Sequence, residues 1–161
     1  MIKKLIDVEN LAARAEELRA GGRRLVFTNG CFDLLHIGHV RYLAAARALG
    51  DALVVGVNGD ESVRALKGEG RPLNRERDRA EVLAALESVD FVTIFSEKRA
   101  TRLLSLVRPA IYVKGGDYTP ETLNPEERAT LDQIGAEIRI LPFEPGYSTS
   151  RLIQQLGPHS G

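Results

Sequence analysis

The sequence contains one cysteine, no tryptophan and no excess charge of either sign, since 22 basic residues balance 22 acidic ones. The lone Cys31 cannot form an intrachain disulfide, which favours a reducing cytoplasm. A net charge of zero supplies no general attraction for nucleic acid, so we do not expect nucleic acid as a partner.

Long apolar runs are also missing. No run approaches the roughly 20 residues that a membrane-spanning helix needs. The start, "MIKKLIDVEN", turns polar too early for a secretory signal. We therefore expect no membrane partner and a cytoplasmic location.

The length of 161 residues, 43% of them hydrophobic, suits a single domain over residues 1–161 with one sizeable core. No repeat, low-complexity tract or linker divides it. Short apolar segments alternate with segments of helical periodicity. Strands are predicted at 24–29, 52–58, 91–95, 110–117 and 136–143, and helices at 8–20, 38–50, 60–66, 75–89, 100–109, 125–135 and 148–156.

This alternation predicts an α/β fold, because strands separated by helices form right-handed crossovers in a parallel sheet. The segment "ALVVGVN" is apolar without alternation, as in a parallel strand covered on both faces. We predict a Rossmann-like doubly wound parallel sheet of about five strands with helices on both faces. Ligands bind such sheets outside the carboxyl ends of the strands. The candidate loops are "NGCFDLLHIGH", "NGDE", "KGGDY" and "FEPGYSTS".

Two histidines stand at the start of the second predicted helix, where His36 and His39 flank Gly38. At this spacing both side chains lie near the end of the helix that has free N–H groups and a partial positive charge. Gly30 and Gly38 have no Cβ, so a polyphosphate can approach the backbone. Imidazoles can donate hydrogen bonds to phosphate oxygens. The pattern predicts a site that stabilises charge on a phosphorus undergoing displacement.

Other interpretations of the histidine pair are less favoured. A zinc site needs further ligands, but no third one is evident nearby, and the residue between the histidines is a glycine where metalloprotease helices have glutamate. We therefore expect no protein-bound metal. A nicotinamide-dependent dehydrogenase would need G-x-G-x-x-G after the first strand, where this chain has "NGCFDLLHIG".

The stretch "GCFDLLHIGHVRYL" resembles the H-x-G-H signature of the nucleotidyltransferase superfamily, which includes cytidylyltransferases and pantetheine-phosphate adenylyltransferase. Downstream, "YSTSRLI" resembles the second signature of that superfamily. The blocks "VNGDESV", "RPLNRERDRAEVLAALESVDFV" and "VKGGDYTPE" most closely resemble the adenylyltransferases that make ADP-heptose. In some organisms that unit is fused to a sugar kinase. Here the resemblance implies the stand-alone form, working beside a separate heptose-phosphate kinase.

The resemblance implies a reaction with two substrates, ATP and D-glycero-β-D-manno-heptose 1-phosphate. The sugar phosphate attacks the α-phosphorus of ATP, pyrophosphate leaves, and the ADP-heptose serves lipopolysaccharide or surface polysaccharide synthesis. A phosphate dianion is already a nucleophile, so catalysis consists mostly of positioning and charge stabilisation. We expect Mg²⁺ to arrive with ATP. Family analogy suggests a homodimer.

The resemblance also assigns roles to residues of this chain. His36 and His39 hold triphosphate oxygens, while Lys67 and Arg79 compensate phosphate charge; these four form the predicted catalytic set. The predicted nucleotide-binding residues are Asn29, Gly30, Cys31, Phe32, Gly38, Lys114, Gly116, Asp117, Tyr147, Ser148 and Thr149. Apart from the resemblance, we predict substrate-binding roles for Asp33, for Asp60 and, because it lies in the same loop as Lys67, for Arg71.

Three of these residues have competing interpretations. Asp33 is a candidate magnesium ligand, although we favour a structural role in which it fixes a loop through backbone N–H groups. Asp60 faces the substrate or caps the helix that begins there. Cys31 has no evident general base beside it, so we expect a small buried side chain and no nucleophile.

Alternatives of function remain open. Glycerol-phosphate cytidylyltransferases share the first signature, but an Arg-Thr pair precedes their second one, where this chain has Phe143 and Glu144. That difference favours heptose without deciding between adenine and cytosine. Archaeal-type FAD synthetases are further relatives. A catalytically silent module would have lost at least one of the phosphate-binding residues, yet all four are present: His36, His39, Lys67 and Ser148.

Overall fold

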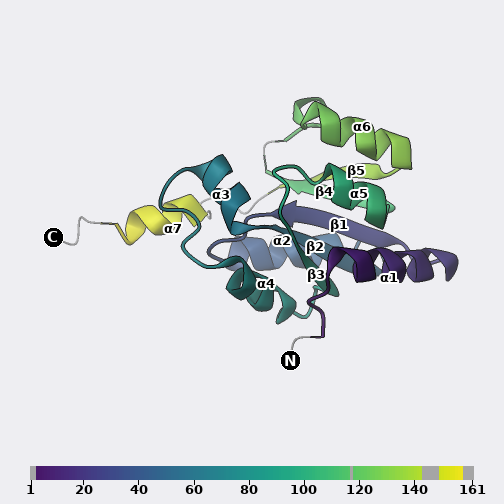
Figure 1. Cartoon of the computed structure of the whole chain (residues 1–161), viewed down its shortest axis with the longest axis horizontal. Helices are drawn as coiled ribbons and strands as arrows, with labels where there is room; N and C mark the ends of the chain where they lie inside the picture. The colour runs from purple at the N-terminus through teal and green to yellow at the C-terminus, as the bar shows by residue number, and fades with distance from the viewer. Residues whose placement is uncertain (1–2, 117, 143–148, 158–161) are drawn as a thin grey trace.

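The computed structural model describes residues 3–116, 118–142 and 149–157. It contains a five-stranded sheet in the order β3-β2-β1-β4-β5, with all neighbouring strands parallel (Figure 1). The predicted Rossmann-like fold is confirmed. The strands are β1 (Leu25–Gly30), β2 (Ala52–Asn58), β3 (Phe91–Phe95), β4 (Ile111–Gly115) and β5 (Glu137–Leu141). The helices are α1 (Val8–Ala20), α2 (Ile37–Arg47), α3 (Asp60–Lys67), α4 (Glu76–Ala84), α5 (Thr101–Val107), α6 (Pro125–Ile134) and α7 (Thr149–Gln155), with a 3₁₀ turn η1 (Pro120–Thr122).

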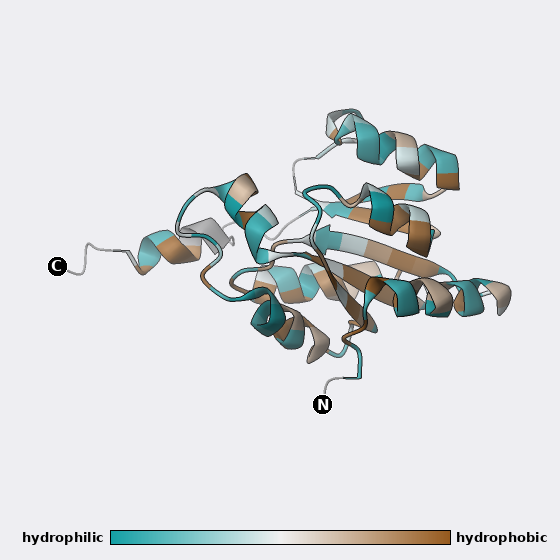
Figure 2. Ribbon diagram, in the orientation of Figure 1, coloured by the Kyte–Doolittle hydropathy of each residue, from teal (hydrophilic) through white to brown (hydrophobic). Residues whose placement is uncertain are grey.

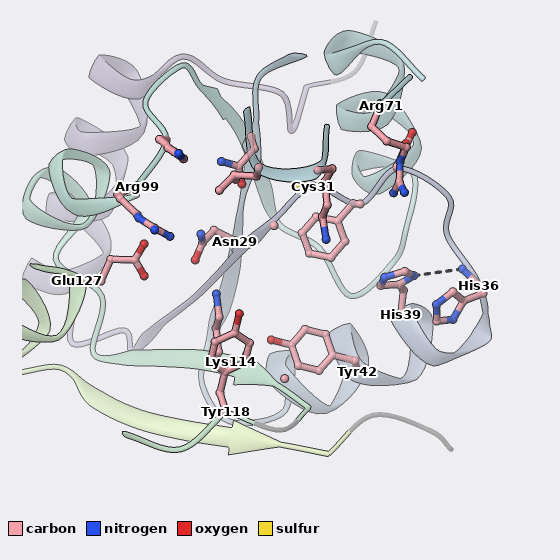
Figure 3. Close-up of a pocket in the computed structure, with 18 residues that line it drawn as sticks. Asn29, Cys31, His36, His39, Tyr42, Arg71, Arg99, Lys114, Tyr118 and Glu127 are labelled. Carbon is pink, nitrogen blue, oxygen red and sulfur yellow. Dashed lines mark hydrogen bonds and ion pairs between the residues drawn. The ribbon is translucent and has the colours of Figure 1, made fainter. Parts of the chain in front are cut away.

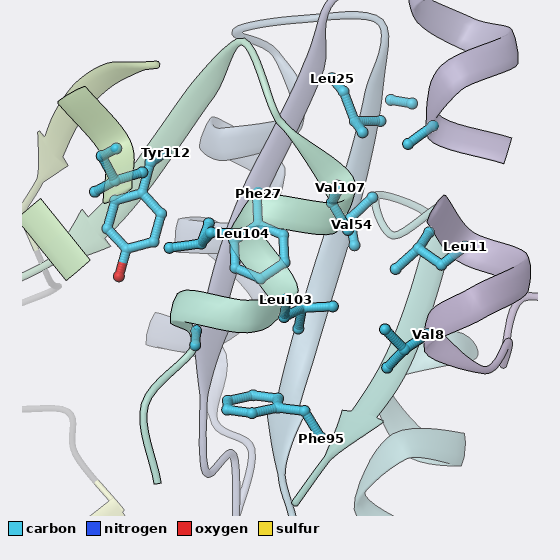
Figure 4. Packing of buried hydrophobic residues seen from close by; sticks show 14 of the residues in the cluster. Val8, Leu11, Leu25, Phe27, Val54, Phe95, Leu103, Leu104, Val107 and Tyr112 are labelled. Atoms are coloured by element: carbon cyan, nitrogen blue, oxygen red, sulfur yellow. The ribbon is translucent and has the colours of Figure 1, made fainter. Parts of the chain in front are cut away.

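The helices cover both faces of the sheet, and hydrophobic residues concentrate along the strands between them (Figure 2). Helices α1, α5 and α6 contribute to one hydrophobic cluster, and α2 and α4 to the other. Leu25 and Phe27 of β1 point into the first cluster, which Figure 4 shows, whereas Val26 points into the second. All of β2 is buried, which explains why its sequence is apolar without alternation.

Local signals set several helix ends. Asp7 caps α1 by accepting a hydrogen bond from the backbone N–H of Asn10. Asn124 caps α6 in the same way, and the helix ends at Gly135, whose φ of 73° is left-handed. In the described part of the chain, no helix is both long and apolar enough to cross a bilayer.

Helix α2 ends at Arg47, three residues before its predicted end, and α4 and α5 also differ from the prediction. The helix expected over 75–89 ends at Ala84, and Val82, expected on its buried stripe with Leu83, is 52% exposed. Arg79 and Leu83 lie on its buried face, so a charged side chain occupies an inward position that the periodicity gave to apolar ones. Helix α5 ends before Pro109, because Arg108 adopts a left-handed conformation with φ 51°.

The order of the strands reverses between β1 and β4, because the chain first builds the sheet outward through β2 and β3 and then returns to the other side of β1. The carboxyl ends of these strands lie at Gly30 and Gly115. In open parallel sheets, the crevice at such a reversal is where ligands bind.

Candidate active site

A pocket of about 480 Å³ lies at the carboxyl ends of β1 and β4, at the reversal of strand order (Figure 3). This volume lies within the ordinary range for small-molecule sites. Its lining includes much of the predicted site: Asn29, Gly30, Cys31, Phe32, Asp33, His36, His39, Lys67, Arg71 and Lys114.

The two histidines form the N-terminal cap of α2. His36 is the N-cap residue, and its Nδ1 accepts a hydrogen bond of 3.1 Å from the backbone N–H of Gly38. Nδ1 of His39 in turn accepts one of 3.3 Å from the backbone N–H of His36. Since Nδ1 of each neutral ring is an acceptor, the proton resides on Nε2. Both imidazoles therefore offer an Nε2–H donor to a ligand.

Electrostatics keep this pair uncharged at neutral pH. Burial, together with a smaller effect of the neighbouring His36, lowers the pKa of His39 to about 4. Burial also lowers the pKa of His36. The ring centroids are 4.0 Å apart, a distance at which two positive charges would repel each other strongly. The two imidazoles are thus neutral hydrogen-bond donors.

The loop after β1 positions His39. Phe32 has a left-handed φ of 49°, which is uncommon for an aromatic residue and costs backbone strain. Its ring meets the ring of His39 edge-on at 5.6 Å. A Cβ on Gly30 would lie 3.1 Å from the Phe32 ring, so this glycine makes room for an aromatic ring. Burial raises the pKa of Cys31, which keeps its thiol protonated and unsuited to nucleophilic attack.

Asp33 anchors the loop between α3 and α4. Its Oδ2 accepts a hydrogen bond of 2.7 Å from the backbone N–H of Leu73 and one of 3.1 Å from Arg71 Nε. Its Oδ1 accepts one of 2.9 Å from the N–H of Asn74, whose amide also donates to the Asp33 carbonyl at 2.7 Å. The structure thus shows the loop-fixing role that we favoured. It also brings Arg71 to the wall of the pocket.

Arg79 requires a correction. We expected it to compensate phosphate charge, but it is 2% exposed and is not part of the pocket lining. Its guanidinium donates to the carbonyl oxygens of Cys31, Asn58 and Asn74 at 2.7, 2.8 and 3.0 Å, and it pairs with Asp60 at 2.8 Å. Arg79 therefore links the carboxyl ends of β1 and β2 from outside the pocket.

Asp60 belongs to the hydrogen-bond network of Arg79. Its carboxylate pairs with Arg79, and it does not line the pocket. The N-cap of α3 is Gly59, so Asp60 does not cap the helix, which was the alternative to substrate binding, but occupies its first turn. Its own backbone N–H donates to Glu76 Oε1 at 2.9 Å. These contacts indicate a supporting role and give no support to substrate binding.

Cations surround the pocket. The expected Lys67, Arg71 and Lys114 line it, and so do Lys98 and Arg99, which the sequence analysis did not consider. Lys98 and Arg99 lie between β3 and α5, at the carboxyl edge of the sheet where binding residues are expected. Their position directly after a predicted strand could have identified Lys98 and Arg99 as binding residues from the sequence. The excess of positive charge suits polyanionic substrates.

Two aromatic residues complete the walls. Lys114 Nζ lies 4.8 Å from the centroid of the Tyr118 ring, and burial lowers the pKa of this lysine. Tyr42 lies one helical turn after His39 and shares a hydrogen bond of 2.8 Å with Thr28. Burial raises the pKa of Tyr42 to about 12, so it stays protonated. Its spacing from His39 in the sequence would have identified it.

Asn58, Leu66 and Glu127 also line the pocket and were absent from the sequence analysis. Glu127 lies on α6, far along the chain from the signatures, and no motif marks it.

Some predicted residues have other positions. Gly38 is buried in the first turn of α2, and Gly116 follows β4 with a left-handed φ of 77°; neither lines the pocket. Thr149 is the first residue of α7. Asp117, Tyr147 and Ser148 lie outside the described residues, as do Phe143 and Glu144.

Comparison with known sequences agrees with this geometry. The family described as "Cytidylyltransferase-like" matches residues 27–155. The chain is 49% identical over 153 residues to the bifunctional protein HldE of Geotalea uraniireducens, covering 95% of this chain and 31% of that protein. It is 51% identical over 154 residues to HldE of a Bradyrhizobium species, with the same two coverages. The chain thus spans about a third of the length of these relatives.

Solved structures show the same fold. A lipopolysaccharide core biosynthesis protein from Thermoplasma volcanium superimposes with a TM-score of 0.62 at 28% identity, covering 76% of this chain and 98% of that one. A pantoate-beta-alanine ligase from Francisella tularensis, crystallised with a β,γ-ATP compound and β-alanine, superimposes with a TM-score of 0.59. At 15% identity, over 91% of this chain and 68% of the ligase, that likeness concerns the fold alone.

Proposed function

This chain belongs to the cytidylyltransferase-like family, and we propose that it transfers AMP from ATP to D-glycero-β-D-manno-heptose 1-phosphate, giving ADP-heptose and pyrophosphate. The observation that carries the proposal is the pair of neutral histidines at the start of α2, within a pocket lined by cations. The sequence blocks that resemble ADP-heptose-forming adenylyltransferases support the choice of substrate.

Two comparisons support the same substrate class. The HldE relatives are named bifunctional, and the chain matches about a third of their length, which fits a transferase unit fused to another activity. The relative from Thermoplasma volcanium is described as a lipopolysaccharide core biosynthesis protein, which fits a role in lipopolysaccharide or surface polysaccharide synthesis.

The mechanism follows from the donors in the pocket. An oxygen of the sugar phosphate attacks the α-phosphorus, an oxygen–phosphorus bond forms, and the bond to the bridging oxygen of the leaving pyrophosphate breaks. The Nε2–H groups of His36 and His39 stabilise the charge that grows on the α-phosphate oxygens. Lys67 and Arg71 offset the charge of the departing phosphates, and the sugar phosphate needs no general base.

Magnesium remains part of the proposal as a companion of ATP. Bound to the phosphates, it would neutralise part of their charge. Among the described residues, no group of three or more His, Cys, Asp or Glu side chains is arranged to hold an ion. Both carboxylate oxygens of Asp33 already accept hydrogen bonds. The residues present therefore fit a metal held chiefly by the nucleotide.

Cellular context is likewise proposed. We infer a cytoplasmic enzyme that acts after a heptose-phosphate kinase and pairs as a homodimer. Size-exclusion chromatography with light scattering tests the last point, since a dimer has twice the mass of the 17.7 kDa chain.

The test of the proposed function measures pyrophosphate release in the presence of magnesium. ATP and CTP are each combined with heptose 1-phosphate and with glycerol 3-phosphate. Release with ATP and heptose 1-phosphate alone is the expected result. Release with CTP and glycerol 3-phosphate alone would contradict the proposed substrates while leaving the phosphate chemistry in place. The His39→Ala variant, assayed in parallel, controls for contaminating activity.

A further inference from the structure

A buried carboxylate lies at one end of the pocket. Glu127 of α6 is 5% exposed and lines the cavity. Its Oε2 accepts from the hydroxyl of Tyr112 at 3.4 Å, and its Oε1 accepts from the backbone N–H of Ala100 at 3.5 Å. Both distances exceed the usual range for these hydrogen bonds. The Tyr112 hydroxyl has a better acceptor in Asn29 Oδ1, at 3.0 Å.

These contacts use little of the carboxylate's capacity. An ionised carboxylate has about four acceptor positions, and one hydroxyl proton cannot serve Asn29 and Glu127 equally. In the described part of the chain, no cation lies within ion-pairing distance of Glu127, although its charge acts on Lys114 and opposes the lowering of that lysine's pKa. A buried charge with weak partners is costly. A ligand that donates hydrogen bonds would offset that cost.

The position of Glu127 indicates which part of a ligand it meets. Figure 3 shows Glu127, Asn29 and Arg99 at the opposite end of the pocket from His36 and His39. A carboxylate repels phosphate, so this end is unsuited to the triphosphate. The groups that Figure 3 shows there are a carboxylate, an amide and a guanidinium, and the nearby Tyr118 ring already packs against Lys114. Hydroxyl groups, by contrast, donate well to a carboxylate.

Asn29 adds a matched group. Since its Oδ1 accepts from Tyr112, its Nδ2 is left to donate to a hydroxyl oxygen. Carboxylate and amide together can thus accept from and donate to neighbouring hydroxyls of one polyol. Lys114 and Arg99 lie nearby, and an acceptor whose hydroxyls lie at Glu127 would place its phosphate among these cations and toward the histidines.

We propose that Glu127, together with Asn29, binds hydroxyl groups of the polyol portion of the acceptor phosphate and thereby determines acceptor specificity. This inference rests on the proposed function in that it presumes a polyhydroxylated acceptor phosphate. It moves Asn29 from the nucleotide, where the family resemblance put it, to the acceptor.

The test compares Glu127→Gln with the matched control Glu126→Gln, which changes the neighbouring, exposed glutamate of the same helix. KM for heptose 1-phosphate should rise by about 10-fold to 100-fold in Glu127→Gln, as expected for loss of a charged hydrogen bond. KM for ATP should stay within about threefold. The ratio of kcat/KM for heptose 1-phosphate to that for glycerol 3-phosphate should fall by about 10-fold, because the smaller acceptor has fewer hydroxyls to lose.

A second variant separates recognition from folding. Tyr112→Phe removes the hydroxyl that holds Asn29 while keeping the buried ring, and it should raise KM for the acceptor by about threefold to 10-fold. Thermal unfolding of each variant shows whether it folds. An unchanged acceptor KM in folded Glu127→Gln would overturn the inference, and so would a rise confined to KM for ATP.

Failure of the proposed function has a different signature. If wild-type protein does not use ATP with heptose 1-phosphate, the proposed function is wrong, and Glu127 is then judged on whichever acceptor phosphate the wild type does use. An unchanged KM for that acceptor, or the lack of any acceptor in the panel, overturns the inference as well.

Discussion

The two ends of the pocket are built in different ways. At one end, His36 and His39 are three residues apart and hold each other through the backbone of a single helix turn. At the other end, Asn29 and Tyr112 are 83 positions apart, and Glu127 comes from a third element. The first end is built by the start of α2 and the adjoining loop, from which Phe32 packs on His39, whereas the second requires β1, β4 and α6 to be packed together.

This difference separates chemistry from recognition. In the proposed mechanism, phosphate stabilisation uses the Nε2–H groups of two histidines at one helix start, which a short segment supplies. Recognition of one acceptor needs donors and acceptors at set positions around its hydroxyls, and these come from several elements of the sheet and its helices. Variants that affect one end, both ends or neither therefore test the division.

Removal of Arg79 should have the largest effect, because its buried guanidinium binds both the carbonyl of Cys31, just after β1, and that of Asn58, at the end of β2. Arg79→Ala leaves the carbonyls of Cys31 and Asn58 without their donor and should lower the free energy of unfolding by about 3–5 kcal/mol. Urea unfolding measures this. The control Arg77→Ala removes a side chain that is 71% exposed and should stay within about 0.5 kcal/mol of wild type. Equal stability of the two variants would contradict the supporting role.

His39→Ala should affect the chemical end alone. Turnover should fall by at least about a hundredfold, as for the loss of one transition-state donor, while KM for the acceptor changes little. Pyrophosphate release at saturating substrates measures turnover, and circular dichroism checks the fold. Ala45→Ser, on an exposed position of α2, is the control. Normal turnover in His39→Ala would refute the assigned role.

The Asp33→Asn variant tests whether a residue within the H-x-G-H sequence block stabilises the fold through contacts with a distant loop. Asp33→Asn loses the charge that accepts from Arg71 and two backbone N–H groups, so the free energy of unfolding should fall by about 1–3 kcal/mol. Asp132→Asn, which changes a side chain that is 65% exposed, serves as the control. If the two variants unfold at the same urea concentration, the anchor contributes nothing measurable.

The last prediction concerns pH. The pKa of His39 is about 4 in the folded protein, below its ordinary value of 6.5, so the unfolded chain takes up a proton first as pH falls. The stability that neutral His39 contributes is therefore complete above about pH 6.5 and declines between about 6.5 and 4. An NMR titration, with His39 assigned by its loss in His39→Ala, should show a midpoint near pH 4. A midpoint near 6.5 would mean that the ring is solvated.

Much of the fold was predictable from the order of the segments. The apolar run of β2 and the alternation of strands with helices indicate a parallel sheet covered on both faces, and the structure confirms it. Helix ends were less predictable. Val82 appeared to belong to a buried stripe, but the helix packs with Arg79 inward because that guanidinium has carbonyl and carboxylate partners inside the fold.

The residues of the candidate site likewise fall into two groups: those that short sequence segments identify, and those that only the packing of distant elements places. His36, His39, Lys67 and Lys114 were found because short segments mark them, and the pocket brings them together. Arg79 matched a family block, yet its guanidinium supports the site by binding the backbone carbonyl of Cys31.

By itself, the sequence determined the parallel α/β fold and the histidine end of the pocket. The sequence signals for both are local: periodicity within an element, and capping within one turn of α2. Only the tertiary structure decided that Arg79 is buried, that Asp33 anchors a distant loop, and that Glu127 faces the pocket. The reason is physical, because burial and hydrogen-bond partners of a charged side chain depend on the elements that pack around it, which its sequence neighbours do not specify.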